Sequence, residues 1–206
     1  MEKKEHIMKH ALELFAAKGF EGTSVRDIAA AAQVNVAMMN YYFGSKEKLF
    51  EAVVEYKASY MKDVLQALEE DKTKTEIEKI DIVIEAYVRR FFSHTAFHRV
   101  LYQELLMLHR ENLHQHIAGI FLKNTLIIKS FIEQGIRKKK FRKVDPELTI
   151  ASIIGSITQV LLSRHMCNML MNKNADFNPY TDKNFTERVI KHIQSLTHSH
   201  LLIDQK

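Results

Sequence analysis

Along most of the chain, apolar residues recur every three or four positions, which is the spacing of one face of an α-helix. The first such stretch places Ile7, Ala11 and Phe15 on one side of a helix. We expect nine helices, over residues 3–18, 25–32, 36–42, 46–70, 76–94, 97–108, 113–135, 146–170 and 184–202. The pattern therefore predicts an all-α protein.

The same spacing predicts which side chains of the middle helices face the interior. In the helix over residues 46–70 they are Leu49, Val53, Tyr56, Tyr60, Val64 and Leu68. In the helices between residues 97 and 136 they are Phe97, Leu101, Leu105, Met107, Phe121, Leu122 and Phe131.

The helix over residues 146–170 is apolar around most of its circumference. Asp145 can cap it, and Pro146 occupies its first position. Its uncharged run, residues 148–163, has 16 residues, fewer than the roughly 18 expected of a membrane-spanning helix. We interpret it as a buried helix of a soluble protein. Its apolar surface needs more packing partners than a chain of this size easily supplies.

Two short helices lie close together near the amino terminus. Ser24 and Asp27 form a capping-box-like start to the first of them. Asn35 is a good N-cap for the second, and Gly44 ends it. Two short helices joined by a tight corner at Gln33 are typical of a helix-turn-helix, which places its second helix in the major groove of DNA.

The residues around this motif resemble the DNA-binding head of the TetR family of bacterial repressors. The resemblance rests on Tyr-Tyr-Phe-Gly-Ser-Lys-Glu-Lys-Leu over residues 41–49 and on Ala-Leu-Glu-Leu-Phe over residues 11–15. It also rests on Lys-Gly-Phe-Glu-Gly-Thr-Ser over residues 18–24, and the match covers about a quarter of the chain. Gln33 stands where the family usually has Gly, at a cost of up to ~1 kcal/mol if its φ is positive. Asn40 stands where the family usually has Tyr, which alters the bases that are read.

The resemblance implies a helix-turn-helix DNA-binding domain over residues 1–46. It also implies a helical ligand-binding and dimerisation domain over residues 47–206. In the family, the last two long helices pair with their two-fold mates, so we expect a homodimer through the helices at 146–170 and 184–202. The expected partners are a palindromic double-stranded DNA operator and a small-molecule effector that releases the repressor.

Residues on the outer side of the second motif helix are the candidate DNA contacts. Asn40 can pair with an adenine edge, and the apolar residues beside it can touch thymine methyl groups. Arg26 can reach a phosphate or pair with Asp27 or Glu21, and the sequence leaves both open. The predicted DNA-binding residues are Thr23, Ser24, Arg26, Val36, Ala37, Met38, Asn40, Tyr41, Tyr42 and Lys46.

Aromatic and Met side chains in the middle of the chain are candidates for an effector pocket, although plain core packing explains each of them as well. The candidates are Tyr56, Tyr60, Phe91, Phe92, Phe97, Tyr102 and Met107, with Glu85, Arg89 and Glu104 as polar anchors. Because few charged groups share their helix faces, we expect a largely apolar effector.

Composition and charge add constraints. The 206 residues include six Gly, two Pro and one Cys, which suits helices and a reducing cytosol. Residues 2–6 precede no apolar run, so we expect no signal peptide and a cytoplasmic protein without membrane contact. The net charge is +5, but the first 50 residues contribute only +1, and the densest basic run is residues 137–143. Bulk charge therefore does not explain DNA binding, and the motif carries that prediction.

Other functional classes fit the sequence less well. No nucleophile–base pair, phosphate loop or set of metal ligands stands at a usable spacing, so we expect no enzyme, no cofactor and no metal site. We interpret the pair His6 and His10, and the histidines between residues 94 and 116, as solvated side chains. A constitutive DNA-binding regulator or adaptor without a ligand remains the alternative to an effector-controlled repressor.

Overall fold

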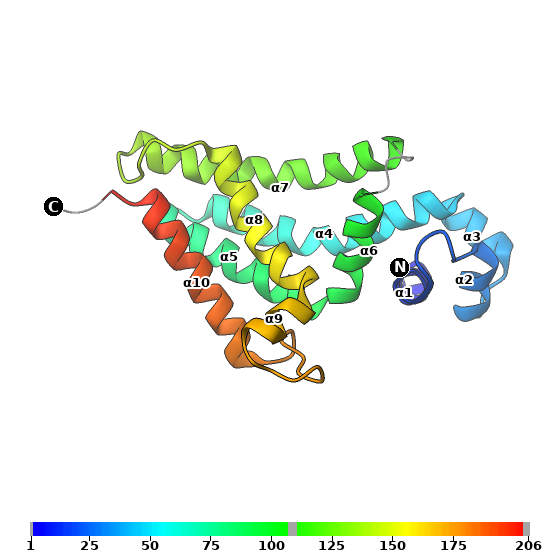
Figure 1. Cartoon of the computed structure of the whole chain (residues 1–206). Coiled ribbons are helices and arrows are strands. Elements are labelled where there is room, and N and C mark those ends of the chain that lie inside the picture. Colours follow the sequence, from blue (N-terminus) through cyan, green and yellow to red (C-terminus); the bar gives the residue numbers. More distant parts are fainter. Residues whose placement is uncertain (1, 107–110, 204–206) are drawn as a thin grey trace. The chain divides into compact units, whose positions relative to one another are not determined.

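The structure is a computed structural model that describes residues 2–106 and 111–203. This part of the chain forms ten α-helices and no strand, apart from one isolated bridge between Phe141 and Leu202 (Figure 1). The helices are α1 (Glu2–Lys18), α2 (Val25–Ala31), α3 (Val36–Phe43), α4 (Lys46–Glu70), α5 (Glu76–Ser93), α6 (Thr95–Leu105), α7 (Glu111–Arg137), α8 (Pro146–Leu162), α9 (Arg164–Leu170) and α10 (Lys183–Leu201). The all-α prediction is confirmed.

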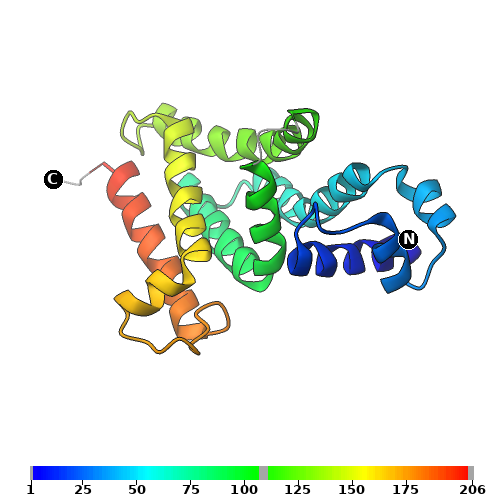
Figure 2. The same ribbon diagram turned by 45° about the vertical axis from the view of Figure 1, so that its right-hand side comes forward.

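The helix predicted over residues 146–170 is in fact two helices, so the expected number of nine was one too low. α8 ends at Leu162, and α9 is bent away from it by 86°. The Arg164 guanidinium donates to the carbonyl oxygens of Ala175 and Phe177 at 3.2 and 3.0 Å. The Tyr180 hydroxyl donates to the Leu161 carbonyl at 2.5 Å. These bonds to the following loop hold the chain in the bend between α8 and α9. Figure 2 shows the bend itself.

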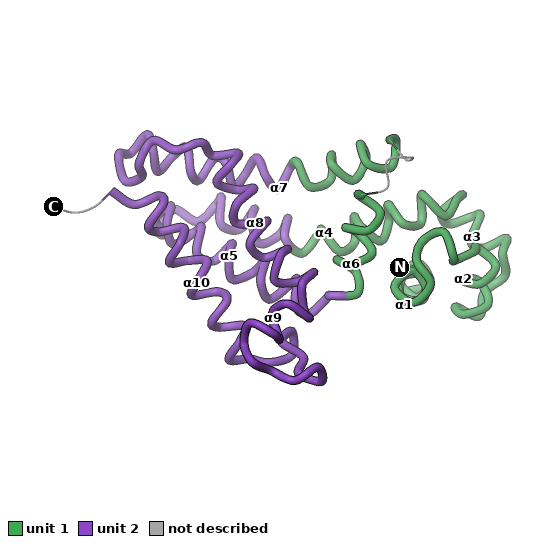
Figure 3. Tube along the Cα trace, viewed as in Figure 1, with its two compact units in different colours: residues 1–60, 96–122 green, residues 61–95, 123–206 purple. Residues whose placement is uncertain are grey.

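The chain divides into two compact units (Figure 3). Unit 1 contains residues 1–60 and 96–122, and unit 2 contains residues 61–95 and 123–206. The first part of α4, to Tyr60, and α6 from Ala96 onward thus belong with the amino-terminal helices. No single helix of the described residues is long and apolar enough to cross a membrane, and α8 with α9 reaches that length only as a bent pair.

An aromatic cluster forms the centre of unit 1. The Phe15 ring stacks on Phe20 with centroids 5.1 Å apart and meets the edge of Phe50 at 5.6 Å. All three side chains are fully buried, and Ile7 and Ile28 complete the cluster from α1 and α2. Each buried side chain of this size contributes about 1.5–3 kcal/mol, so this cluster fixes the first three helices against α4.

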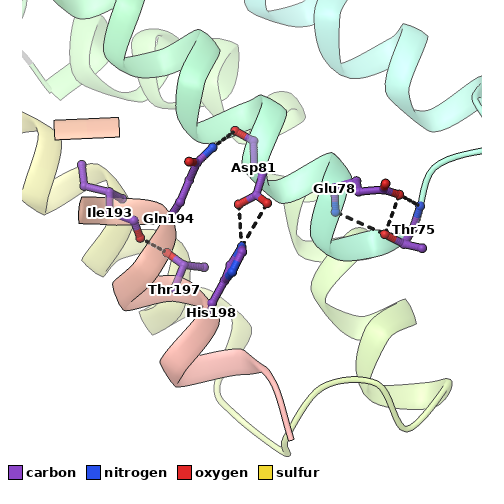
Figure 4. A network of polar contacts seen from close by, with 7 residues as sticks. All are labelled: Thr75, Glu78, Asp81, Ile193, Gln194, Thr197 and His198. Carbon is purple, nitrogen blue, oxygen red and sulfur yellow. Dashed lines mark hydrogen bonds and ion pairs between the residues drawn. The ribbon is translucent and has the colours of Figure 1, made fainter. Parts of the chain in front are cut away.

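In unit 2, α10 packs against α5 and α8 (Figure 2). Figure 4 shows how polar contacts set the register between α10 and α5. The His198 Nε2 atom lies 2.8 and 3.0 Å from the two carboxylate oxygens of Asp81. The Gln194 amide donates to the Asp81 carbonyl at 3.2 Å, and Thr75 with Glu78 forms a capping box at the start of α5.

Some side chains predicted to face the interior are exposed. Tyr56 and Tyr60 are 46% and 48% exposed, whereas Met61 and Leu65 are buried. The buried stripe of α4 therefore runs through Met61 and Leu65 in place of Tyr60, and the tyrosines keep their polar tips in water. Leu122 in α7 is also exposed, and Met107 lies outside the described residues.

Candidate functional site

Two amino-terminal helix caps build the helix-turn-helix. Ser24 and Asp27 form the reciprocal capping box at the start of α2, with 3.1 Å from the Asp27 N–H to the Ser24 Oγ and 2.9 Å in return. Hydrogen bonds from the Ser24 hydroxyl and main chain lower the pKa of Asp27. The Asn35 side chain accepts a hydrogen bond from the Met38 N–H at 2.7 Å and starts α3. These bonds fix the entry of both helices.

The corner between α2 and α3 has the conformation that favours glycine. Gln33 has a φ of 53°, in the left-handed region, and its side chain is exposed. The corner is closed by the Val34 N–H, which donates to the Ala29 carbonyl at 2.9 Å. Gly44, with a φ of 78° and a ψ of −47°, ends α3 at a second position with positive φ. Gln33 therefore occupies a position where a side chain costs stability.

α3 buries one side and presents the other. Met39 and Phe43 are buried against the core of unit 1. On the other side Ala37 and Asn40 are exposed, and Tyr41 is 84% exposed. Val36 is 39% exposed, and Met38 and Tyr42 are half-buried. A short helix with this anchored inner side can enter a DNA groove without losing its packing.

Two predicted phosphate contacts turn out to have structural roles. Thr23 is 1% exposed, and its hydroxyl donates to the Gly19 carbonyl at 2.8 Å. The Lys46 ammonium donates to the carbonyls of Phe20 and Thr23 at 2.9 and 3.0 Å, and it lies 4.4 Å from the centroid of the Phe20 ring. Thr23 therefore has no hydroxyl to offer to DNA. Two of the three donors of the Lys46 ammonium are therefore engaged within unit 1.

Other cations near the helix-turn-helix are exposed. Arg26 is exposed, and within the described residues neither of its predicted ion pairs, with Asp27 or Glu21, is formed. Lys48, in the first turn of α4, is exposed as well. The Lys4 ammonium lies 5.9 Å from the centroid of the Tyr42 ring, and both line one hollow with Lys48. Neither Lys4 nor Lys48 was among the predicted DNA-binding residues, although Lys48 stands only four residues after Gly44.

The predicted effector residues are divided between the two units. In unit 1, Tyr56 and Tyr60 are half-exposed, Tyr102 is half-buried and Phe97 is buried. Glu104 is also buried, at 4% exposure, and burial raises the pKa of its carboxyl group.

In unit 2, Phe91 and Phe92 are buried, and Phe92 stacks on Phe185 with centroids 6.1 Å apart. Arg89 pairs with Glu85 at 2.8 Å and with Glu187 at 2.6 Å, and all three side chains are nearly half-exposed. Glu85 and Arg89 thus form an ion pair along the surface of α5, and the Arg89–Glu187 pair links α5 to α10. The prediction that they anchor an effector has no support from this geometry, because exposed pairs are already well solvated.

The comparisons with known proteins agree on one family. Residues 7–53 match the family described as "Bacterial regulatory proteins, tetR family", and residues 73–162 match the "Tetracyclin repressor-like, C-terminal domain". The chain is 32% identical over 140 residues to "Probable HTH-type transcriptional regulator YttP" of Bacillus subtilis, a match that spans 67% of each chain. It is 30% identical over 146 residues to the HTH-type transcriptional repressor NicS of Pseudomonas putida, across 68% of this chain and 66% of NicS.

Solved structures show the same fold. The transcriptional regulator FadR from Bacillus subtilis, in complex with stearoyl-CoA, superposes with a TM-score of 0.74. The match covers 93% of this chain and 97% of FadR at 20% sequence identity. A helix-turn-helix with an exposed second helix, joined to further helices, defines a DNA-binding transcriptional regulator. The chain belongs to the TetR family.

Proposed function

We propose that the chain is a homodimeric repressor that binds a palindromic operator and is released by a small, largely apolar effector. The observation that carries the DNA-binding half of this proposal is the geometry of α3. Its inner side is fixed by Met39 and Phe43, and its outer side presents Ala37, Asn40 and Tyr41. A rigid helix with a polar reader beside small apolar residues suits base edges in the major groove.

Each outer residue has a role in this proposal. Asn40 reads an adenine, and Val36, Ala37 and Met38 touch thymine methyl groups. Ser24, Arg26, Tyr41, Tyr42 and Lys46, together with Lys48, contact the phosphate backbone.

α8 and α10 provide the surface for the second copy. Leu148 and Leu162 on α8 are 66% and 45% exposed, and Leu196 on α10 is 53% exposed. A groove between the two helices is lined by small residues such as Gly155 and by Val189. Exposed apolar side chains beside a groove are typical of helix–helix interfaces.

The dimer has a sharp test on α10. Leu196→Glu should convert the dimer to a folded monomer in light scattering, because it places a charge on the exposed apolar surface. The matched control is Ser195→Glu, which adds the same charge to the neighbouring exposed position. Ile157 is unsuitable for this purpose, since it is fully buried and a charge there unfolds the protomer itself. A native chain that is monomeric at micromolar concentration would contradict the proposed dimer.

The proposed effector is apolar because the buried candidates are aromatic, with Phe91, Phe92 and Phe97 each at 5% exposure or less. The structure of FadR contains stearoyl-CoA, whose long acyl chain is apolar while its coenzyme A part carries charged phosphates. An apolar chain can therefore bind within this fold. An effector that binds one arrangement of the dimer better than another shifts the population away from the form that fits the operator.

Release of labelled operator DNA tests the effector. A series of fatty acyl compounds should lower the anisotropy of the bound DNA, whereas a sugar phosphate should not. Phe91→Trp should block release and leave operator binding intact, since the larger ring fills the site. If no lipophilic compound releases the DNA or raises the melting temperature, the proposal of an effector is rejected. The chain is then a constitutive regulator, and the proposal that it binds DNA is unaffected.

A further inference from the structure

The proposed function makes no use of the most basic segment of the chain. Residues 137–143, here called the basic loop, join α7 to α8 and contain six cations and no acidic residue. All six cationic side chains are exposed. The basic loop belongs to unit 2, whereas the helix-turn-helix belongs to unit 1.

The path of the basic loop is fixed by buried contacts. The N–H groups of Lys140 and Phe141 donate to the Gly135 carbonyl at 2.9 and 3.1 Å. A Cβ atom at Gly135 would lie 2.2 Å from the Phe141 ring, so only glycine permits this approach. The Arg142 N–H donates to the Leu201 carbonyl at 2.7 Å and ties the loop to the end of α10. The cations therefore project from a preorganised backbone.

Intramolecular ion pairs account for only part of this charge. Lys138 lies 2.5 Å from Glu76, and Arg137 lies 3.9 Å from Glu133. In the described ranges, no acidic side chain lies within ion-pair distance of three further cations, which are Lys139, Lys140 and Lys143. Lys139 and Lys140 are consecutive and exposed just after α7, and Lys143 follows three residues later in the same exposed segment. Their charges concentrate positive potential on this segment.

One of these cations occupies a strained position. Lys139 follows the end of α7 at a φ of 54°, where helices most often place glycine. Cations near the end of α7 stabilise its dipole, but Arg137 in the last turn and Lys138 directly after it already do so. A glycine at position 139 would therefore cap α7 at lower cost. The chain retains a charge at a position where charge is not needed for folding.

We propose that the basic loop binds the phosphate backbone of duplex DNA outside the operator, as a second, sequence-independent DNA contact. Closely spaced ammonium groups on a fixed turn match a row of phosphates and release their counterions. An anionic membrane fits less well, because the only apolar side chain of the loop, Phe141, is 3% exposed and cannot insert into lipid.

The test uses the full chain with its recognition helix disabled. Ala37→Asp with Asn40→Asp adds two carboxylates to the exposed side of α3, which repel DNA without touching the core. In this background, binding of a short labelled duplex of unrelated sequence is measured by anisotropy across a salt series. Lys139→Gln, Lys140→Gln and Lys143→Gln together should weaken binding at least ~10-fold at low salt and reduce the slope of log K against log salt by about 2–3 units.

A matched control removes the same three charges from other exposed positions of unit 2, by Lys62→Gln, Lys183→Gln and Lys191→Gln. This control should retain the binding and the slope. Equal losses in both triple variants, or a background protein that binds no duplex, would overturn the proposal. The proposal would also be overturned if the triple variant of the basic loop lost binding to phosphatidylglycerol vesicles while its DNA binding stayed unchanged.

A single substitution separates charge from folding. Lys139→Gly should raise the melting temperature, since it relieves the positive φ, and should still reduce the salt slope by about 0.9 units. A variant that is more stable and binds DNA less well shows that the lysine serves binding. Unchanged DNA binding in this variant would exclude Lys139 from the contact, and a lower melting temperature would refute the argument from backbone strain.

Discussion

The corner of the helix-turn-helix offers a direct test of how the motif is built. Gln33 has a φ of 53°, and its side chain is exposed, so replacing it removes no buried contact. The left-handed conformation costs a non-glycine residue about 1–2 kcal/mol. Glycine avoids this cost but gives the unfolded chain more freedom, which opposes the gain by about 0.4–1 kcal/mol. Gln33→Gly should therefore stabilise the protein by about 0.5–1 kcal/mol.

For a chain of this length, such a gain raises the melting temperature by roughly 1–4 °C. Thermal unfolding followed by circular dichroism measures it, in the transition that unfolds unit 1. Gln33→Ala is the matched control, because it removes the same side chain and keeps the Cβ atom. If Gln33→Gly melts no higher than Gln33→Ala, the corner is not strained and the reasoning from its backbone angle is refuted.

Three further predictions follow from the contacts of single residues. Lys48→Ala should reduce the salt slope of operator binding by about 0.9 units without changing the melting temperature. Lys46→Ala should lower the melting temperature, because the Phe20 and Thr23 carbonyls lose their hydrogen-bond donor. Equal melting temperatures for the two variants would contradict this. Burial raises the folded-state pKa of Glu104, so the folded chain holds this proton more tightly and stability falls as pH rises from the ordinary carboxyl pKa through the raised one. Glu104→Gln should thus raise the melting temperature at pH 7 and flatten this fall, and an unchanged pH profile would count against it. Gly135→Ala should lower the free energy of unfolding in urea by about 1–3 kcal/mol, because the new methyl group would lie 2.2 Å from the Phe141 ring. A variant as stable as the wild type would show that the ring moves freely.

Helix positions were predictable because local signals set them. Asn35 and Asp145 each accept a hydrogen bond from the N–H three residues on, as their side chains and places in the sequence indicate. The outer side of α3 was predictable as well, since Ala37, Asn40 and Tyr41 are exposed as expected. These features depend on neighbours within one or two turns of helix, so they can be predicted from the local sequence.

What the sequence did not reveal depends on distant partners. The break at Ser163 is held by carbonyls of Ala175 and Phe177, more than ten residues further on. No pattern within residues 146–170 encodes those acceptors. The hydroxyl of Thr23 and the ammonium of Lys46 were assigned to DNA because polar groups on a motif usually serve binding. Their main-chain partners in the loop around residues 19–23 become visible only in the folded unit.

The candidate effector site was the least predictable part. Aromatic side chains at helical spacing serve a core and a pocket equally well, and only the packing distinguishes them. Phe92 contacts Tyr180 and Phe185, which come from a loop and a helix almost one hundred residues away in sequence. Arg89, the expected anchor, instead pairs with Glu187 at the surface.

The central claim is that α3 reads operator DNA in a two-fold symmetric complex. Selection of bound duplexes from a random pool, with wild-type protein and Asn40→Ala in parallel, tests it most directly. The wild type should enrich a palindrome with half-sites about one helical turn apart. Asn40→Ala should enrich the same palindrome with the preference for adenine lost at one position in each half-site. Enrichment of no palindrome by the wild type, or an identical site selected by both proteins, would contradict the account.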